Sequence, residues 1–415
     1  MAEQMQSVPA GSLRFHPRLI RGFVVGVLCL HLFLFIGARR RIAQGHPDFT
    51  IFYTAGELLR EGAGAQLYEP LAQLRVQEKL GDAASRGQPL PYTHPPFEAP
   101  IFLPLALLPY VWAYSLWDLL NLVLLAGVVL WLRHSLRVLQ SIPAWEICFG
   151  LLAFFPVFAC FLQGQDSILQ LLLCTAGFFA LQKGSDVPAG CWFALALFKF
   201  QLILPLVLLL VLWKRSRLLI GFVPVSIGLV LVSTALVGWK ELAFYPVYVL
   251  RSSLAPIEVP PQLMASLRGL VLGWPVVPRP LGLVLVVVAS ILLFILAAIW
   301  GRRNAEPEKF GVRFSLAIAV TLLISGHTNA HDYCLLLLAM VLVADYCFRF
   351  ATREPPRILA LFLPILPILI SPLWIVLWLV YAHVNLMAIP LLGWAWTIGK
   401  ELSRRLPSLA PQTAG

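Results

Sequence analysis

Long apolar runs alternate with short polar segments along most of the chain. A helix needs about 20 apolar residues to cross the hydrocarbon core of a bilayer, where its backbone must satisfy its own hydrogen bonds. The pattern therefore predicts an all-α, polytopic integral membrane protein. It indicates about twelve transmembrane helices, near residues 19–38, 111–132, 144–162, 166–182, 188–199, 201–213, 217–238, 281–300, 312–326, 331–348, 358–377 and 380–398.

The segment 39–110 interrupts this alternation with mixed charge and a second kind of helical pattern. Residues 53–60 and 71–80 place apolar side chains on one face at helical spacing, as interfacial helices do. Residues 97–109 are apolar, but they are short and contain Pro100 and Pro104, so we expect a re-entrant or surface-lying segment there. The prediction is a structured first extracytoplasmic loop.

Composition supports the membrane class, because 60% of the residues are hydrophobic and only 12% are charged. The net charge of +11 would also suit a nucleic-acid partner. The basic residues, however, fall in short clusters between apolar runs, which is typical of orientation signals. We therefore expect contact with membrane lipids and no nucleic-acid partner. The seven cysteines lie within apolar segments and have no metal or disulfide spacing.

The basic clusters assign sides to the polar segments, because Lys and Arg near span ends favour the cytoplasm. We expect a cytoplasmic N-terminal segment at 1–18, a transmembrane domain at 19–400 and a cytoplasmic tail at 401–415, with 39–110 outside. Arg39-Arg40-Arg41 is an exception that this topology places outside, where contact with a lipid phosphate is one explanation. The predicted location is the cytoplasmic (inner) membrane.

Unusual polar residues gather in the predicted outer segments, whereas the inner segments are plain basic clusters. A binding or catalytic site at the extracytoplasmic face is the economical interpretation. The candidate residues are Asp48, Tyr92, His94, Gln165, Lys199, Arg268, His327 and His331.

Several of these residues lie in motifs whose order and spacing resemble glycosyltransferase family 87, of the GT-C superfamily. The motifs span most of the membrane region: Asp48 to Gly56 (DFTIFYTAG), Leu67-Tyr68, Tyr92 to Phe97 (YTHPPF), Pro104 to Pro109 (PLALLP), Ala113 to Trp117 (AYSLW), Gly164-Gln165, Ala189-Gly190 with Lys199, and Ser266 to Leu270 (SLRGL). The resemblance implies a GT-C-type fold.

The resemblance also implies a polyprenyl-phosphate-linked sugar donor, a lipid or glycan acceptor, and transfer of a hexose with inversion, for which mannose is the expected sugar. It places an acid of the first outer loop as the general base, and Asp48 occupies that position. We expect no cofactor.

The residue chemistry agrees with this expectation, because one carboxylate suffices to take the proton of an attacking hydroxyl. A departing lipid phosphate needs positive charge or hydrogen-bond donors nearby. Arg268, Lys199, His327 and His331 are candidates for that role. The alternatives are contact with lipid headgroups for Arg268, snorkelling for Lys199 and simple solvation for the two histidines. Tyr92 and His94 lie beside Pro95 and Pro96, where His94 either lines an acceptor pocket or caps a turn.

A metal-independent reaction is favoured, because Gln165-Asp166-Ser167 offers one carboxylate and a hard cation prefers several oxygens. His327, His331 and Asp332 could bind zinc only if the segment were helical, which Gly326 disfavours.

A transporter or lipid flippase is the alternative function. Such proteins are also polytopic, but they commonly consist of paired halves with broken helices at matching positions. No internal repeat is present here, and only the first half carries a long structured loop.

Overall fold

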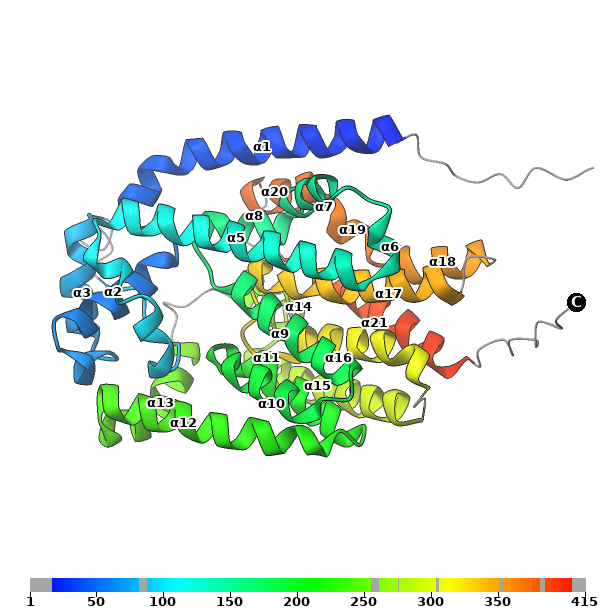
Figure 1. Cartoon of the computed structure of the whole chain (residues 1–415). Helices are drawn as coiled ribbons and strands as arrows, with labels where there is room; N and C mark the ends of the chain where they lie inside the picture. The colour runs from blue at the N-terminus through cyan, green and yellow to red at the C-terminus, as the bar shows by residue number, and fades with distance from the viewer. Residues whose placement is uncertain are drawn as a thin grey trace, which may run out of the picture.

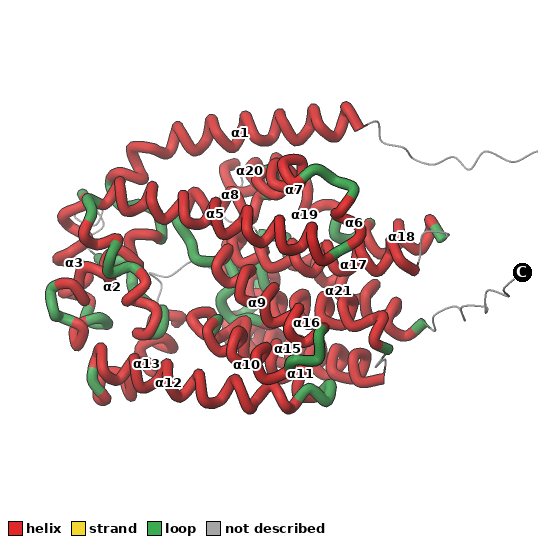
Figure 2. The backbone as a smooth tube through the Cα atoms, viewed as in Figure 1, coloured by secondary structure: helices red, strands yellow, loops and turns green. Residues whose placement is uncertain are grey.

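The computed structural model describes residues 17–81, 88–254, 261–274, 276–303, 306–350, 354–380 and 385–404. Helices and connecting loops make up all of these ranges, with no strand among them, as the all-α prediction requires (Figure 2). Most of the predicted terminal segments 1–18 and 401–415 lies outside the described residues.

Among the described residues, five helices are long and apolar enough to cross a membrane. They are α1 (Pro17–Ala43), α5 (Tyr110–Ser135), α12 (Leu219–Val237) with its leading turn, α15 (Arg279–Arg303), and α17 (Leu336–Phe350) with the 3-10 helix η9 (Ala330–Leu335). Two bent pairs raise the number to seven: α7 (Ala144–Leu152) with α8 (Phe155–Gln163), and α10 (Asp186–Leu195) with η5 (Leu197–Lys199) and α11 (Phe200–Leu212). The chain is thus a polytopic membrane protein.

The predicted number of about twelve spans exceeds what the described helices offer by length and composition. Prolines explain part of the difference, because each one removes a helical hydrogen bond and disturbs the preceding turn. The run 358–377 consists of three short helices: α18 (Pro355–Phe362), α19 (Leu366–Leu369) and α20 (Ser371–Val380). Residues 381–384 of the last predicted span lie outside the described residues.

The remaining helices fill the bundle or connect its spans. They are α2 (Phe49–Arg60), η1 (Gly64–Gln66), α3 (Pro70–Gln77), η2 (Glu78–Leu80), η3 (Pro96–Ile101), η4 (Leu105–Leu107), α6 (Arg137–Gln140), α9 (Ser167–Gln182), η6 (Ser216–Leu218), α13 (Trp239–Leu254), η7 (Pro261–Leu263), α14 (Leu267–Leu272), η8 (Pro307–Lys309), α16 (Phe310–Ile324) and α21 (Ala388–Ser403).

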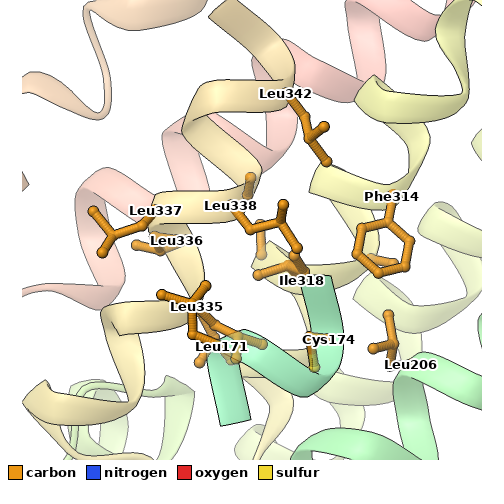
Figure 3. Close-up of a cluster of buried hydrophobic side chains, with 14 of the residues drawn as sticks. Leu171, Cys174, Leu206, Phe314, Ile318, Leu335, Leu336, Leu337, Leu338 and Leu342 are labelled. Carbon is orange, nitrogen blue, oxygen red and sulfur yellow. The ribbon is translucent and has the colours of Figure 1, made fainter. Parts of the chain in front are cut away.

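Helix α16 forms the centre of the bundle and packs against α11, α15, α17 and α21. It is apolar on all sides, and nearly every residue in it is buried, as expected for a helix enclosed by others. Figure 3 shows the contact in detail: Phe314 and Ile318 of α16 face Leu338 and Leu342 of α17, with α9 and α11 alongside. This packed core joins α9, α11, α16 and α17.

The first loop packs as a second, smaller core at one end of the bundle. Figure 1 shows α2 and α3 together at that end, on the left, whereas α1 begins and α21 ends at the opposite end. Aromatic side chains fill this second core, among them Phe52, Tyr68, Phe102 and Trp117. The segment 97–109 contributes η3 and η4, two short 3-10 helices that do not span.

Candidate active site

Asp48 lies at the start of α2, directly after the turn that follows α1. Gly45 adopts a left-handed conformation in this turn, and its carbonyl accepts a hydrogen bond from Thr50 Oγ1 at 2.9 Å. The Asp48 side chain makes no capping bond to its own helix. Instead Asp48 Oδ2 accepts a hydrogen bond from Gln165 Nε2 at 2.7 Å, and the Asp48 backbone N–H donates to Gln163 Oε1 at 3.2 Å. Gln163 and Gln165, more than 100 residues away in the sequence, therefore hold the backbone and the carboxylate of Asp48 in place.

The turn 163–166, which carries both glutamines, is held by one face of α5. Tyr114 Oη donates to the Phe161 carbonyl at 2.7 Å, Trp117 Nε1 donates to the Gly164 carbonyl at 2.9 Å, and Asn121 Nδ2 donates to the Gln165 carbonyl at 3.1 Å. The spacing of these three donors places them on the same side of a helix. The turn between α8 and α9 is therefore fixed by buried hydrogen bonds.

Lys199 is buried at the break between α10 and α11, with 3% of its side chain exposed. Its Nζ lies 2.8 Å from Asp166 Oδ1 and 2.6 Å from Asp332 Oδ1, and it donates to Ser167 Oγ at 2.7 Å. A buried ammonium ion is costly unless it is paired and hydrogen-bonded. These partners balance the charge of Lys199 within the protein, and its side chain also lines the polar cavity described below.

His94 and Glu98 extend this charged cluster toward the first loop. His94 Nδ1 lies 2.6 Å from Glu98 Oε2 and 3.7 Å from Asp166 Oδ2. Burial raises the pKa of Glu98 to about 7; attraction to His94 opposes the shift, and repulsion from Asp166 adds to it. Burial alone would lower the pKa of His94, but Glu98 and then Asp166 outweigh it and raise this pKa above its ordinary value.

Asp332 and the segment before η9 close the site on the other side. Asp332 Oδ2 accepts a hydrogen bond from the Asn329 backbone N–H at 2.8 Å, within a capping box. His331 Nε2 lies 3.7 Å from Asp332 Oδ1. Burial lowers the pKa of His327 to about 4, with partial opposition from Asp332, so this imidazole is neutral near pH 7.

These elements enclose a polar cavity of about 110 Å³. Its lining combines carboxylates, amides, imidazoles and a buried ammonium. The residues are Asp48, Ile51, Leu90, Pro91, Thr93, His94, Gln165, Lys199, Gln201, His327, Asn329, His331 and Asp332.

An apolar cavity of about 190 Å³ adjoins the polar one, and Asp48, Asn329 and His331 line both. Its remaining walls are mainly aromatic and aliphatic side chains of α8 and α20, such as Phe158 and Trp374. A larger groove of about 470 Å³ runs between α1 and α8, with Arg41 and His46 among its lining residues. Asp48 thus stands at the junction of a polar and an apolar space.

Six of the eight predicted site residues line the polar cavity: Asp48, His94, Gln165, Lys199, His327 and His331. Two do not line it. Tyr92 is fully buried beneath it, and its hydroxyl donates to the Pro95 carbonyl at 3.2 Å. Arg268 Nη1 donates to the Gly326 carbonyl at 2.9 Å, so it contacts the chain that leads into His327.

The sequence interpretation missed the carboxylates around Asp166. It placed a lone acid there, but Glu98 and Asp332 both belong to the same cluster. Glu98 is the one acid in the apolar run 97–109, and an ionisable residue in such a run is a signal for function. His94, Glu98 and Asp166 also lie close enough together to hold a metal ion. The other candidate zinc ligands were His327, His331 and Asp332. The segment 325–329 is not helical, and the Asp332 carboxylate forms an ion pair with Lys199.

A polar cavity beside the break between α10 and α11, joined to an apolar space, offers room for a ligand that has both a polar and an apolar part. The model of glycosyltransferase family 87 matches residues 92–326, more than half of the chain. The chain therefore belongs to glycosyltransferase family 87 and is a membrane glycosyltransferase. No curated protein and no solved structure matches it.

The matched segment contains His94, Gln165 and Lys199, but it begins after Asp48 and ends before His327. Asp48 and the segment 327–332 lie outside the matched residues, but they line the same cavity as His94, Gln165 and Lys199.

Proposed function

We propose that this glycosyltransferase moves a hexose, mannose, from a polyprenyl-phosphate donor to a lipid or glycan acceptor with inversion, and that Asp48 is the general base. The observation that carries the proposal is the position of Asp48 on both the polar and the apolar cavity. A sugar linked to an isoprenoid phosphate has the same polarity, with a hydroxylated ring at one end and an apolar chain at the other.

In the proposed reaction the acceptor hydroxyl enters the polar cavity and its proton passes to a carboxylate oxygen of Asp48. The acceptor oxygen bonds to the anomeric carbon while the bond from that carbon to the phosphate oxygen breaks. The lipid phosphate leaves with the electron pair as a stable anion, so the leaving group requires no proton. Gln165, which donates to Asp48 Oδ2, leaves Oδ1 as the oxygen that accepts the proton.

The phosphate requires a cation, and Arg41 is the best candidate on the surface of these spaces. The charge of Lys199 is neutralised by Asp166 and Asp332. Arg268 does not line the cavity, and its guanidinium donates a hydrogen bond to the Gly326 carbonyl. Arg41 lines the apolar groove beside α1, which also reaches Pro47 and Gln163. We propose that Arg41 binds the donor phosphate and that Arg268 and Tyr92 support the cavity walls.

The family match favours this transferase over the transporter or flippase alternative. We further propose that the site faces the extracytoplasmic side of the cytoplasmic membrane, in agreement with the distribution of Lys and Arg.

The purified protein in lipid vesicles tests the donor class. We expect hexose transfer from polyprenyl-phosphate-mannose to an extracted membrane-lipid acceptor fraction, no transfer from a nucleotide-mannose, and inverted anomeric configuration in the product by NMR. Arg41→Ala should raise the apparent KM for the donor, whereas Arg39→Ala serves as the matched control. Transfer from the nucleotide sugar alone, or retained configuration, would contradict the proposal.

A further inference from the structure

Three potential metal ligands converge beneath the polar cavity from two separate parts of the chain. His94 and Glu98 come from the segment that forms η3, and Asp166 comes from the turn between α8 and α9. One ligand atom from each residue lies within 4.8 Å of the others. Glu98 and Asp166 are each 1% exposed or less, which makes this a buried cluster rather than an acidic surface patch.

Two carboxyl groups of this cluster lie close together. Glu98 Oε1 is buried and accepts no hydrogen bond from an N–H group of the described residues, and the carboxyl groups of Glu98 and Asp166 lie close enough to share a proton. Asp166 Oδ1 contacts Lys199, while Asp166 Oδ2 lies 3.7 Å from His94 Nδ1. Because two facing carboxylates are costly to bury, a cation bound between Glu98 and Asp166 would stabilise both.

Formal charge points to a divalent ion. With Glu98 ionised and His94 neutral, the carboxylates of Glu98, Asp166 and Asp332 carry three negative charges against the single positive charge of Lys199. Without an ion, a proton held by the His94–Glu98 pair offsets one of these charges. A divalent cation with a neutral imidazole ligand would bring the sum of these groups to zero. Lys199 on Asp166 Oδ1 would then act as an outer partner that directs Oδ2 toward the ion.

We propose that His94 Nδ1, Glu98 and Asp166 Oδ2 bind one first-row divalent metal ion, Zn²⁺ or Mn²⁺. A set of one imidazole and two carboxylates suits these ions better than Ca²⁺ or Mg²⁺, which prefer oxygen ligands alone. His94 also lines the polar cavity, so the ion has a route from that space. The ion would fasten η3 to the 163–166 turn and would neutralise the carboxylates behind Asp48.

The test is direct binding to the full-length protein in detergent, after removal of metal with a chelator. Free Mn²⁺ gives a sharp six-line EPR spectrum that broadens on binding, so a titration yields both stoichiometry and affinity. We expect one Mn²⁺ per chain, displaced by Zn²⁺. Glu98→Gln should raise the apparent Kd at least about tenfold. Glu57→Gln is the control, because Glu57 is a buried acid of the same loop that pairs with Arg60 instead.

Pulsed EPR of the Mn²⁺-loaded wild-type protein gives a second readout that needs no variant to fold. We expect coupling to the nitrogen of a single imidazole, and the coupling should vanish in His94→Gln. Absence of Mn²⁺ and Zn²⁺ binding at millimolar concentration, absence of nitrogen coupling, or equal affinity in Glu98→Gln and wild type would each overturn the proposal. None of these readouts depends on transferase activity, so the metal site and the proposed reaction fail separately.

Discussion

At the residue scale, one hydrogen bond determines how the Asp48 carboxylate faces the cavity. Gln165 Nε2 holds Oδ2, and Gln163 holds the Asp48 backbone N–H. Within the described part of the chain, the bond from Gln165 is the one hydrogen bond to the Asp48 carboxylate, which does not cap α2. In the proposed reaction, the geometry of proton transfer therefore depends on Gln165.

Replacing Gln165 with Leu should lower kcat about 10- to 100-fold with little change in KM, because a misplaced base slows chemistry more than it weakens binding. Steady-state kinetics in vesicles measures this change. Gln66→Leu is the matched control, since Gln66 is an exposed glutamine of the first loop and lines none of the three spaces. Unchanged kcat in Gln165→Leu would show that Asp48 is oriented by something else.

At the element scale, the 163–166 turn connects the helix packing to the site, because α5 holds the turn and the turn contacts Phe49 and Asp48. Gly164 adopts φ +61°, and a Cβ atom placed there would lie 2.7 Å from Phe49 Cβ. Any side chain at this position would therefore press on the first residue of α2, next to Asp48. The three donors of α5 hold the turn from the opposite side.

Gly164→Ala should destabilise the protein and also reduce activity, because it adds a steric clash to the cost of a left-handed residue. The left-handed backbone costs about 1–2 kcal/mol, and overpacking adds about 1–3 kcal/mol. Gly184→Ala isolates the first cost, since Gly184 has φ +75° with no atom within 4 Å of its Cβ position. Thermal unfolding and activity of both variants are the measurements. An equal effect of the two substitutions on both would contradict the proposed role of the Phe49 contact.

Polar residues within or beside apolar runs could be predicted as site residues from the sequence. Asp48, Gln165 and Lys199 stand out in this way, because a membrane segment tolerates such groups only where they face protein or water. Their partners could not be predicted. Lys199 lies at the 64° break between α10 and α11, whereas Asp166 follows α8 and Asp332 lies in η9. Their contact depends on how these distant segments pack, which no local pattern specifies.

The helix count illustrates the same limit. An apolar run of 15 residues such as α16 has the composition of a span, but its burial on nearly all sides depends on neighbours that are distant in sequence. Hydrophobicity identifies what avoids water and does not distinguish a lipid-facing helix from one enclosed by protein.

At the scale of the whole molecule, the site lies toward the end of the bundle that carries α2 and α3, whereas α1 begins and α21 ends at the other end (Figure 1). If the proposed orientation holds, the α2–α3 end faces outward. The groove between α1 and α8 and the polar cavity would then both open to the outer half of the membrane.

Cysteine labelling in intact cells tests this orientation. In a background without Cys29, Cys148 and Cys191, the three cysteines that are not buried, a membrane-impermeant maleimide should label Glu61→Cys in the first loop. It should not label Lys183→Cys in the connection between α9 and α10, because the distribution of Lys and Arg predicts residues 183–187 to be cytoplasmic. The reverse pattern would place the site on the cytoplasmic side.

The central claim is that Asp48 takes the proton of the acceptor hydroxyl, and Asp48→Asn tests it most directly. The amide keeps an oxygen for the hydrogen bond from Gln165 but cannot serve as a base. We predict that kcat falls at least about 100-fold, while thermal stability and donor affinity match the wild type. Glu61→Gln, an acid of the same loop paired with Arg75 on the surface, should retain full activity. Wild-type turnover by folded Asp48→Asn would contradict the account.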